Sequence, residues 1–248
     1  MSILDPISKN GRIFMLAYDQ GIEHGPKDFN DRNYDPKFIF EIALNSDVSC
    51  VAMQYGNAKR HYTKEISEKM PLVLKLNGKT ALNSSNYMSA LLADVDDAVA
   101  LGAKAIGFTI FPGQISEHVQ FEQFSAIRRH AEQHNIATIL WSYARGPEIE
   151  DQHDQKVVAY AVRSAAELGA DAVKVKYTGT VESFVWAAKI GGGIDVLASG
   201  TDNFPEDYVG EVAQLVRNGI KGIAVGRKVW QDENPVLFAK DISKVIYS

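Results

Sequence analysis

The sequence predicts an α/β fold, a single (β/α)₈ TIM barrel that spans residues 1–248 as one domain. The length of 248 residues is close to the ~250 typical of a lone barrel. Eight short apolar runs rich in β-branched residues recur at intervals of roughly 25 to 35 residues, with segments of helical periodicity between them. Because alternating strands and helices are typical of a parallel sheet, and no linker interrupts the series, we expect one closed barrel.

The apolar runs predict the strands of this barrel. Most are apolar at nearly every position, which is typical of parallel strands that are covered on both faces. The expected strands are Ile13–Tyr18, Val48–Met53, Leu72–Leu76, Ala105–Ile110, Ile136–Trp141, Ala172–Tyr177, Ile194–Ala198 and Gly222–Val225.

Several segments between the runs have the helical period. A glycine follows three of them and leads directly into an apolar run, as in Leu101-Gly-Ala-Lys-Ala-Ile, Leu168-Gly-Ala-Asp-Ala-Val and Asn218-Gly-Ile-Lys-Gly-Ile. Glycine after the last turn is a common helix end, so these phrases indicate a repeated helix–strand unit. The expected helices include Asp94–Leu101, Phe121–His134, Lys156–Leu168 and Tyr208–Val216.

The composition excludes several classes of protein. A net charge of −5 gives no electrostatic footprint for nucleic acid. No apolar run approaches the ~20 residues of a membrane span, and residues 1–12 lack the apolar core of a signal peptide, so we expect a cytoplasmic protein. The single cysteine, Cys50, excludes an internal disulfide, and its apolar surroundings predict a buried core thiol rather than a nucleophile.

Two lysines share one face of the sixth expected strand. Side chains alternate along a strand, so Lys174 and Lys176 should point into the barrel while Val173 and Val175 pack on the helices. Burial, together with Lys176 as a neighbouring like charge, should lower the pKa of Lys174. A neutral amine there could attack a carbonyl and form an imine. Alternatively, both lysines extend from the barrel mouth and bind an anion.

Polar side chains also lie at the ends of the first and the fifth expected strand. These positions matter because the active sites of such barrels lie at the carboxyl ends of the strands. Trp141, Tyr143 and Arg145 occupy alternate positions, so all three should line the mouth. The tyrosine could then transfer a proton and the arginine could hold an anion. A Trp/Tyr pair that only packs the upper core is the alternative. Asp19, Glu23 and His24 together could suggest a metal site, but no second His or Cys lies near any other strand tip, so we expect no metal ligands there.

The last two strands end in Ser199-Gly-Thr-Asp and Gly226-Arg-Lys. Glycine-containing loops after these two strands of a barrel commonly bind phosphate through backbone N–H groups. The planar guanidinium of Arg227 would add a cation suited to phosphate.

Five motifs occur in order at the expected strand ends, and together they resemble the archaeal-type class I fructose-1,6-bisphosphate aldolases, whose Schiff-base chemistry is shared by DeoC-like and FbaB-like TIM barrels. The similarity runs from about Asp19 to Gln231. The motifs are Asp19-Gln-Gly-Ile-Glu-His-Gly-Pro26, Lys75-Leu-Asn-Gly78, Trp141-Ser-Tyr-Ala-Arg-Gly146, Val173-Lys-Val-Lys-Tyr-Thr-Gly179 and Gly226-Arg-Lys-Val-Trp-Gln231.

The resemblance implies a lyase of glycolysis and gluconeogenesis that needs no cofactor, acts on a sugar phosphate and forms a homo-oligomer. It implies that Lys174 forms the Schiff base, that Tyr143 transfers a proton, and that Asp19 assists carbinolamine formation. Substrate contacts are implied for ten further positions, the last five around the ketone-side phosphate: Gln20, His24, Trp141, Arg145, Lys176, Ser199, Gly200, Thr201, Gly226 and Arg227.

The chain departs from the family pattern at two positions, and three other functions remain as alternatives. The family often has Gly-Gly where this chain has Gly200-Thr201, and Pro where Ala144 stands. A relative that makes 2-amino-3,7-dideoxyheptulosonate shares the lysine, the tyrosine and the barrel. A metal-free sugar-phosphate isomerase would explain the phosphate loops but leave Lys174 unused, and a non-catalytic sugar-phosphate sensor is the third possibility.

Overall fold

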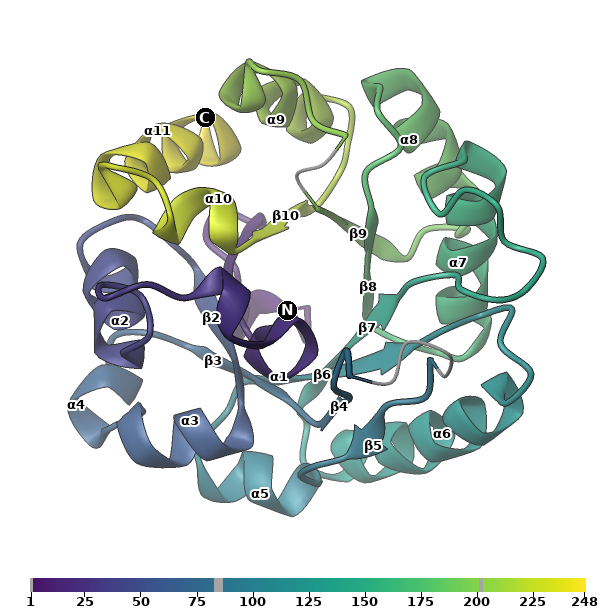
Figure 1. The fold of residues 1–248 in the computed structure, drawn as a ribbon, viewed down its shortest axis with the longest axis horizontal. Coiled ribbons are helices and arrows are strands. Elements are labelled where there is room, and N and C mark those ends of the chain that lie inside the picture. The colour runs from purple at the N-terminus through teal and green to yellow at the C-terminus, as the bar shows by residue number, and fades with distance from the viewer. Residues whose placement is uncertain (1, 83–86, 201–202) are drawn as a thin grey trace.

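The computed structural model describes residues 2–82, 87–200 and 203–248, and its central feature is a closed barrel of parallel strands (Figure 1). Neighbouring strands follow the order β1-β2-β3-β6-β7-β8-β9-β10, and β10 pairs back onto β1. The strands are β1 (Ile13–Tyr18), β2 (Cys50–Gln54), β3 (Leu72–Lys75), β6 (Ala105–Ile110), β7 (Ala137–Ser142), β8 (Ala172–Lys176), β9 (Asp195–Ser199) and β10 (Gly222–Val225). The eight predicted strands are therefore confirmed, with shifts of at most two residues at their ends.

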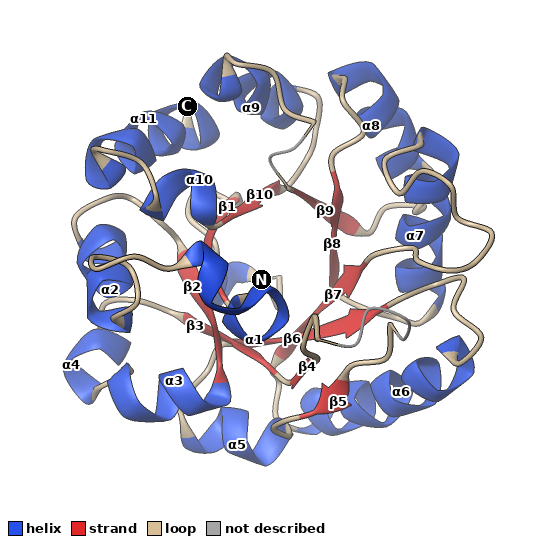
Figure 2. Ribbon diagram, in the orientation of Figure 1, coloured by secondary structure: helices blue, strands red, loops and turns tan. Residues whose placement is uncertain are grey.

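A layer of helices surrounds the strands (Figure 2). Its members are α2 (Pro36–Leu44), α3 (Tyr55–His61), α4 (Lys64–Ser67), α5 (Val95–Ala100), α6 (Glu117–Gln133), α7 (Gln155–Glu167), α8 (Val181–Lys189), α9 (Tyr208–Arg217) and α11 (Pro235–Tyr247). The helices predicted from periodicity correspond to α5, α6, α7 and α9.

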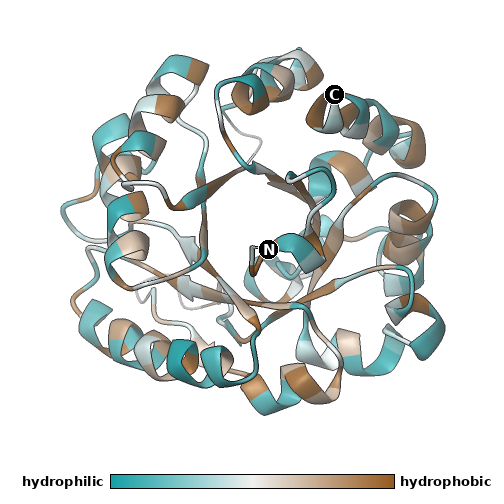
Figure 3. Ribbon diagram, turned by 180° about the vertical axis from the view of Figure 1, so that it is seen from behind, coloured by the Kyte–Doolittle hydropathy of each residue, from teal (hydrophilic) through white to brown (hydrophobic). Residues whose placement is uncertain are grey.

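Side-chain alternation divides the apolar residues into two cores. The larger core lies between the strands and the helices and contains Val173, Val175 and Tyr177 of the β8 segment. The smaller core fills the barrel interior with side chains such as Met15 and Ala172. Leu4 and Ile7 of the N-terminal segment join the interior core, and the N-terminus lies over the barrel axis in the rear view of Figure 3.

Gly107 of β6 makes room for the largest interior side chain, Trp141. A Cβ atom at Gly107 would lie 2.4 Å from the Trp141 ring, a distance at which the ring would have to move. Thr109 of β6 pairs with Trp141, so the indole lies inside the barrel directly below its mouth. The absence of a side chain at Gly107 thus fixes the floor of the cavity described below.

The loops at the carboxyl ends of the strands carry extra elements that periodicity did not predict. After β1 come α1 (Gly21–His24) and the 3₁₀ turn η2 (Gly25–Asp28), and β10 is followed by α10 (Arg227–Trp230). A short antiparallel pair, β4 (Asn77–Gly78) and β5 (Ala90–Leu91), follows β3. These elements are too short to show a hydrophobic period.

Cys50 is completely buried in the interior core, as the sequence predicted. Burial raises the pKa of its thiol to about 12, so the side chain stays a neutral thiol at neutral pH. Over the described ranges, no helix combines the length and the apolar content needed to cross a membrane.

Candidate active site

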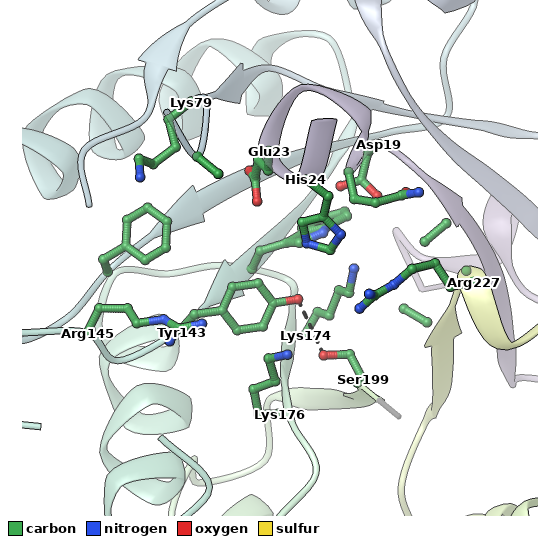
Figure 4. Close-up of a pocket in the computed structure, with 18 of the residues that line it drawn as sticks. Asp19, Glu23, His24, Lys79, Tyr143, Arg145, Lys174, Lys176, Ser199 and Arg227 are labelled. Carbon is green, nitrogen blue, oxygen red and sulfur yellow. Dashed lines mark hydrogen bonds between the residues drawn. The ribbon is translucent and has the colours of Figure 1, made fainter. Parts of the chain in front are cut away.

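A cavity of about 340 Å³ opens at the carboxyl ends of the strands, and the predicted site residues gather around it (Figure 4). The expectation for Thr201 lies outside the described residues. The other twelve all line the cavity: Asp19, Gln20, His24, Trp141, Tyr143, Arg145, Lys174, Lys176, Ser199, Gly200, Gly226 and Arg227.

Lys174 lies near the centre of this group. It occupies the middle of β8, between Trp141 of β7 and Leu197 of β9 in the strand register, and it is 6% exposed. Its Nζ atom is 4.8 Å from the centroid of the Trp141 ring. The predicted inward orientation of Lys174 is therefore confirmed, and the ring face supplies a partner for its charge.

The prediction of a lowered pKa for Lys174 is wrong for the free protein. Burial acts to lower the pKa, but Tyr143, Asp19 and Glu23 act in the opposite direction and leave the pKa raised. The prediction considered burial together with the neighbouring like charge of Lys176, and it left out the effect of these three side chains. The resting amine is thus an ammonium ion, and its nitrogen can attack a carbonyl only after a nearby base has removed a proton.

Tyr143 faces the same space from the segment after β7. Its hydroxyl lies 3.3 Å from Oγ of Ser199, and that Oγ donates a hydrogen bond of 2.9 Å to the backbone carbonyl of Val175. Burial raises the pKa of Tyr143, so the side chain is a neutral phenol in the free protein. The Lys176 amine lies 5.7 Å from the Tyr143 ring centroid, and Figure 4 shows Tyr143, Lys174 and Lys176 converging on one region.

Three side chains that line the cavity have buried polar atoms without a hydrogen-bond partner among the described residues. These atoms are the amide nitrogen and the amide oxygen of Gln20, Nε1 of Trp141 and Nε of Arg145. Because burying an unpaired polar group is costly, such atoms at a cavity wall indicate groups that a ligand satisfies. Gln20 could thus donate to and accept from a hydroxyl group, while Trp141 could only donate.

Asp28, which the sequence did not single out, connects two of the predicted ligand-binding residues. Its carboxylate is only 5% exposed. Oδ2 lies 2.6 Å from Nδ1 of His24, and Oδ1 lies 3.6 Å from a guanidinium nitrogen of Arg227. One buried anion therefore orients an imidazole and a guanidinium that come from opposite ends of the chain.

A second buried lysine lies beside the site, and the sequence indicated it only as part of the Lys75-Leu-Asn-Gly78 motif. Lys75 of β3 is 1% exposed, and its amine donates to both the backbone carbonyl and the side-chain oxygen of Asn77. Its Nζ lies 5.9 Å from the Trp141 ring centroid. Burial lowers the pKa of Lys75, with Lys174 acting in the same sense. The parity of Lys75 with the interior residue Val73 was the sequence signal that could have found it.

Fold and site together define a class: barrel enzymes that present a lysine amine to a carbonyl substrate. The chain belongs to the DeoC/LacD aldolase family, whose model matches residues 13–232. It is 41% identical to the class 1 fructose-bisphosphate aldolase of Thermoproteus tenax, over 97% of this chain and 91% of that one. The same enzyme of Halobacterium salinarum is 37% identical, over 98% and 93%.

A solved structure also matches the whole barrel. It is an archaeal fructose-1,6-bisphosphate aldolase whose catalytic lysine is covalently bound to the carbinolamine intermediate of the substrate. It is 39% identical in sequence, covers 99% of this chain and 98% of its own, and superposes with a TM-score of 0.93. The predicted family and fold are thereby confirmed.

Proposed function

We propose that this chain is a class I aldolase that reversibly cleaves fructose 1,6-bisphosphate to dihydroxyacetone phosphate and glyceraldehyde 3-phosphate, with Lys174 as the covalent amine. The observation that carries the proposal is the position of Lys174. Its amine is buried at the barrel mouth, 4.8 Å from the Trp141 ring, among a phenol and two carboxylates that affect its ionisation. The names of the two curated relatives favour this substrate over a heptulosonate precursor.

Imine formation begins with removal of a proton from the Lys174 ammonium, and Asp19, 7% exposed, is the proposed acceptor. The nitrogen lone pair then bonds to C2 of the ketose, and the former carbonyl oxygen takes the proton back from Asp19. A second proton passes from nitrogen through Asp19 to this hydroxyl, which leaves as water. The product is a protonated imine.

Carbon–carbon cleavage uses the imine as an electron acceptor. Tyr143 takes the proton of the C4 hydroxyl while the electrons of the C3–C4 bond move to the imine nitrogen, and glyceraldehyde 3-phosphate leaves. Burial favours the phenol form of Tyr143, which donates a proton to the aldehyde in the synthesis direction. In cleavage, the nearby positive charge of the imine favours the phenolate. The remaining enamine is protonated at C3 and hydrolysed, which releases dihydroxyacetone phosphate and Lys174.

The distribution of cations around the cavity supports a substrate with a phosphate at each end. Arg227 lies on one side of Lys174 in Figure 4, whereas Arg145 and Lys79 lie on the other. We assign the ketone-side phosphate to Arg227 with Gly226, Ser199 and Gly200, and the distal phosphate to Arg145 and Lys79. Lys174 then lies between the two, where C2 of a six-carbon chain would be.

Borohydride reduction tests the covalent step. Incubation with dihydroxyacetone phosphate and borohydride should inactivate the protein irreversibly and place the adduct on Lys174 in a peptide map. Lys174→Ala should show no adduct, while Lys176→Ala is the matched control on the same strand face and should keep it. An adduct on Lys176 would contradict the assignment, and the absence of any adduct would favour the sugar-phosphate isomerase.

We also propose that the enzyme works in glycolysis or gluconeogenesis, in the cytoplasm and as a homo-oligomer. Large apolar side chains that are exposed on neighbouring helices support an association surface. Tyr160 of α7 is 72% exposed and Trp186 of α8 is 42% exposed. Analytical ultracentrifugation of the wild type and of Trp186→Ser measures this directly, and a monomeric wild-type protein would contradict the oligomer.

A further inference from the structure

We propose that Asp96, His130 and His134 form a binding site for a divalent transition-metal ion on the outer wall of the barrel. His130 and His134 are four residues apart on α6, so their imidazoles lie on one face of the helix. Asp96 comes from the first turn of α5, which packs beside α6. Among the described residues, this is the group of three or more potential ligands whose donor atoms all lie within 4.8 Å of one another.

The donor atoms are already close to the separations that a metal ion requires. Nε2 of His130 is 3.2 Å from Oδ1 of Asp96, and Nε2 of His134 is 4.0 Å from the same oxygen. In a tetrahedral zinc site with ligand distances of about 2.0–2.2 Å, two ligand atoms are about 3.4 Å apart. Small rotations of these surface side chains would therefore bring all three atoms into the coordination sphere.

The two imidazoles and the carboxylate also converge on one point. Both Nε2 atoms face one carboxylate oxygen, and the two imidazole rings lie 5.1 Å apart. A single divalent ion between the three side chains would let both nitrogens act as lone-pair donors to one centre.

The ligand set indicates which ion would bind. Two imidazole nitrogens and one carboxylate oxygen suit Zn²⁺, Cu²⁺, Ni²⁺ or Co²⁺ rather than Mg²⁺ or Ca²⁺, which prefer oxygen ligands only. The three side chains are between 37% and 71% exposed, so an ion can enter from solvent without any opening of the fold. Water would complete the coordination sphere.

The site is separate from the proposed chemistry. None of the three residues lines the cavity that contains Lys174. The helices α5 and α6 lie side by side in the outer layer of helices (Figure 1). A bound ion would join α5, a helix of only six residues, to the much longer α6. Its role would be structural, because a ligand that binds only the folded state stabilises that state.

Zinc titration with and without a chelator tests the site. Calorimetry should show one saturable Zn²⁺ site, Co²⁺ should give the visible absorption of a low-symmetry nitrogen and oxygen site, and Zn²⁺ should raise the Tm. Asp96→Asn, His130→Ala and His134→Ala should each raise the Kd at least about tenfold, the loss that even indirect partners of a metal cause. Turnover should be unaffected by all three variants.

His118→Ala is the matched control, because His118 is an exposed histidine of the same helix that lies outside the cluster. It should bind Zn²⁺ like the wild type. Circular dichroism checks that each variant is folded. If a histidine variant does not fold, Asp96→Asn tests the site instead, because it changes the shape of the side chain least. Unchanged Zn²⁺ affinity in Asp96→Asn and His130→Ala, or a wild-type protein that does not bind Zn²⁺ or Co²⁺, would overturn the proposal.

Discussion

The Nδ1 atom of His24 lies 2.6 Å from Oδ2 of Asp28, a contact between a residue of the cavity wall and a buried residue behind it. The carboxylate favours the imidazole tautomer with a proton on Nδ1, which leaves Nε2 for the cavity. Because Asp28 also lies 3.6 Å from Arg227, it sets the orientation of the proposed phosphate-binding guanidinium.

Asp28→Asn should therefore weaken substrate binding more than it slows the chemistry. The amide keeps the shape of the side chain but loses the charge, so we expect the KM for fructose 1,6-bisphosphate to rise about tenfold, the low end for hydrogen bonds to charged groups. Steady-state kinetics measure the split between KM and kcat. Imine trapping with unphosphorylated dihydroxyacetone is the control and should be unaffected, whereas an unchanged KM would leave Asp28 with a purely structural role.

Arg227→Ala removes the proposed phosphate contact itself. A charge-assisted hydrogen bond contributes roughly 1.5–3 kcal/mol, so the KM for the bisphosphate should rise by about one to two decades. Arg227 is also a partner of Asp28, so combining the two substitutions should cost less than the sum of their separate effects. A wild-type KM in Arg227→Ala would place the ketone-side phosphate elsewhere in the cavity.

Tyr143→Phe separates proton transfer from covalent capture. The substitution keeps the ring and deletes the hydroxyl that lies 3.3 Å from Ser199. General acid–base groups typically contribute 10²–10⁴-fold, so we expect cleavage to slow by about that factor. Borohydride should still label Lys174, since attack on the ketone relies on Lys174 and Asp19. Near-normal turnover, or lost labelling in a folded variant, would contradict the assignment.

Lys75→Met should change how stability depends on pH. Burial lowers the folded-state pKa of Lys75 below 10.5, so the unfolded chain binds more protons between that lowered pKa and pH 10.5. The contribution of Lys75 to stability is therefore fully present above pH 10.5 and is lost as the pH falls through the folded-state pKa.

The free energy of unfolding of Lys75→Met, minus that of the wild type, should thus be larger at neutral pH than at pH 10. Urea denaturation of both proteins at the two pH values gives this difference. Asn77 retains other partners, because its side-chain oxygen also accepts from the Thr109 amide and its carbonyl from Gln54. Lys69→Met, which replaces a side chain that is 60% exposed, should show no such difference. An equal change in stability between the two pH values in both variants would contradict this explanation.

Removal of metal ions should leave turnover intact. The proposed imine needs no metal, and the candidate zinc ligands lie outside the catalytic cavity. Dialysis against a strong chelator should therefore preserve the rate of cleavage even if it lowers the Tm. Loss of activity that Zn²⁺ restores would show that the chemistry depends on a metal.

Local patterns were sufficient to predict much of this protein. The bounds expected for β1, β6 and β10 match the structure residue for residue, because apolar runs and side-chain alternation depend only on nearby positions. The same alternation correctly placed Lys174 inside the barrel and Val173 against the helices. The short elements α1, η2 and α10 escaped prediction, since a single turn carries no period.

The sequence by itself thus determined the barrel, the side chains of its strands that point inward, and most of the residues that face its mouth. Only the tertiary structure decided how those residues behave. The pKa of Lys174 is raised because Tyr143 approaches it from the segment after β7 and Asp19 and Glu23 approach it from the loop after β1. His24 and Arg227 are linked only because the barrel closes between β1 and β10. Periodicity is a property of neighbouring positions in the chain. Ionisation and orientation depend instead on distances in space, and these distances exist only once the barrel has closed.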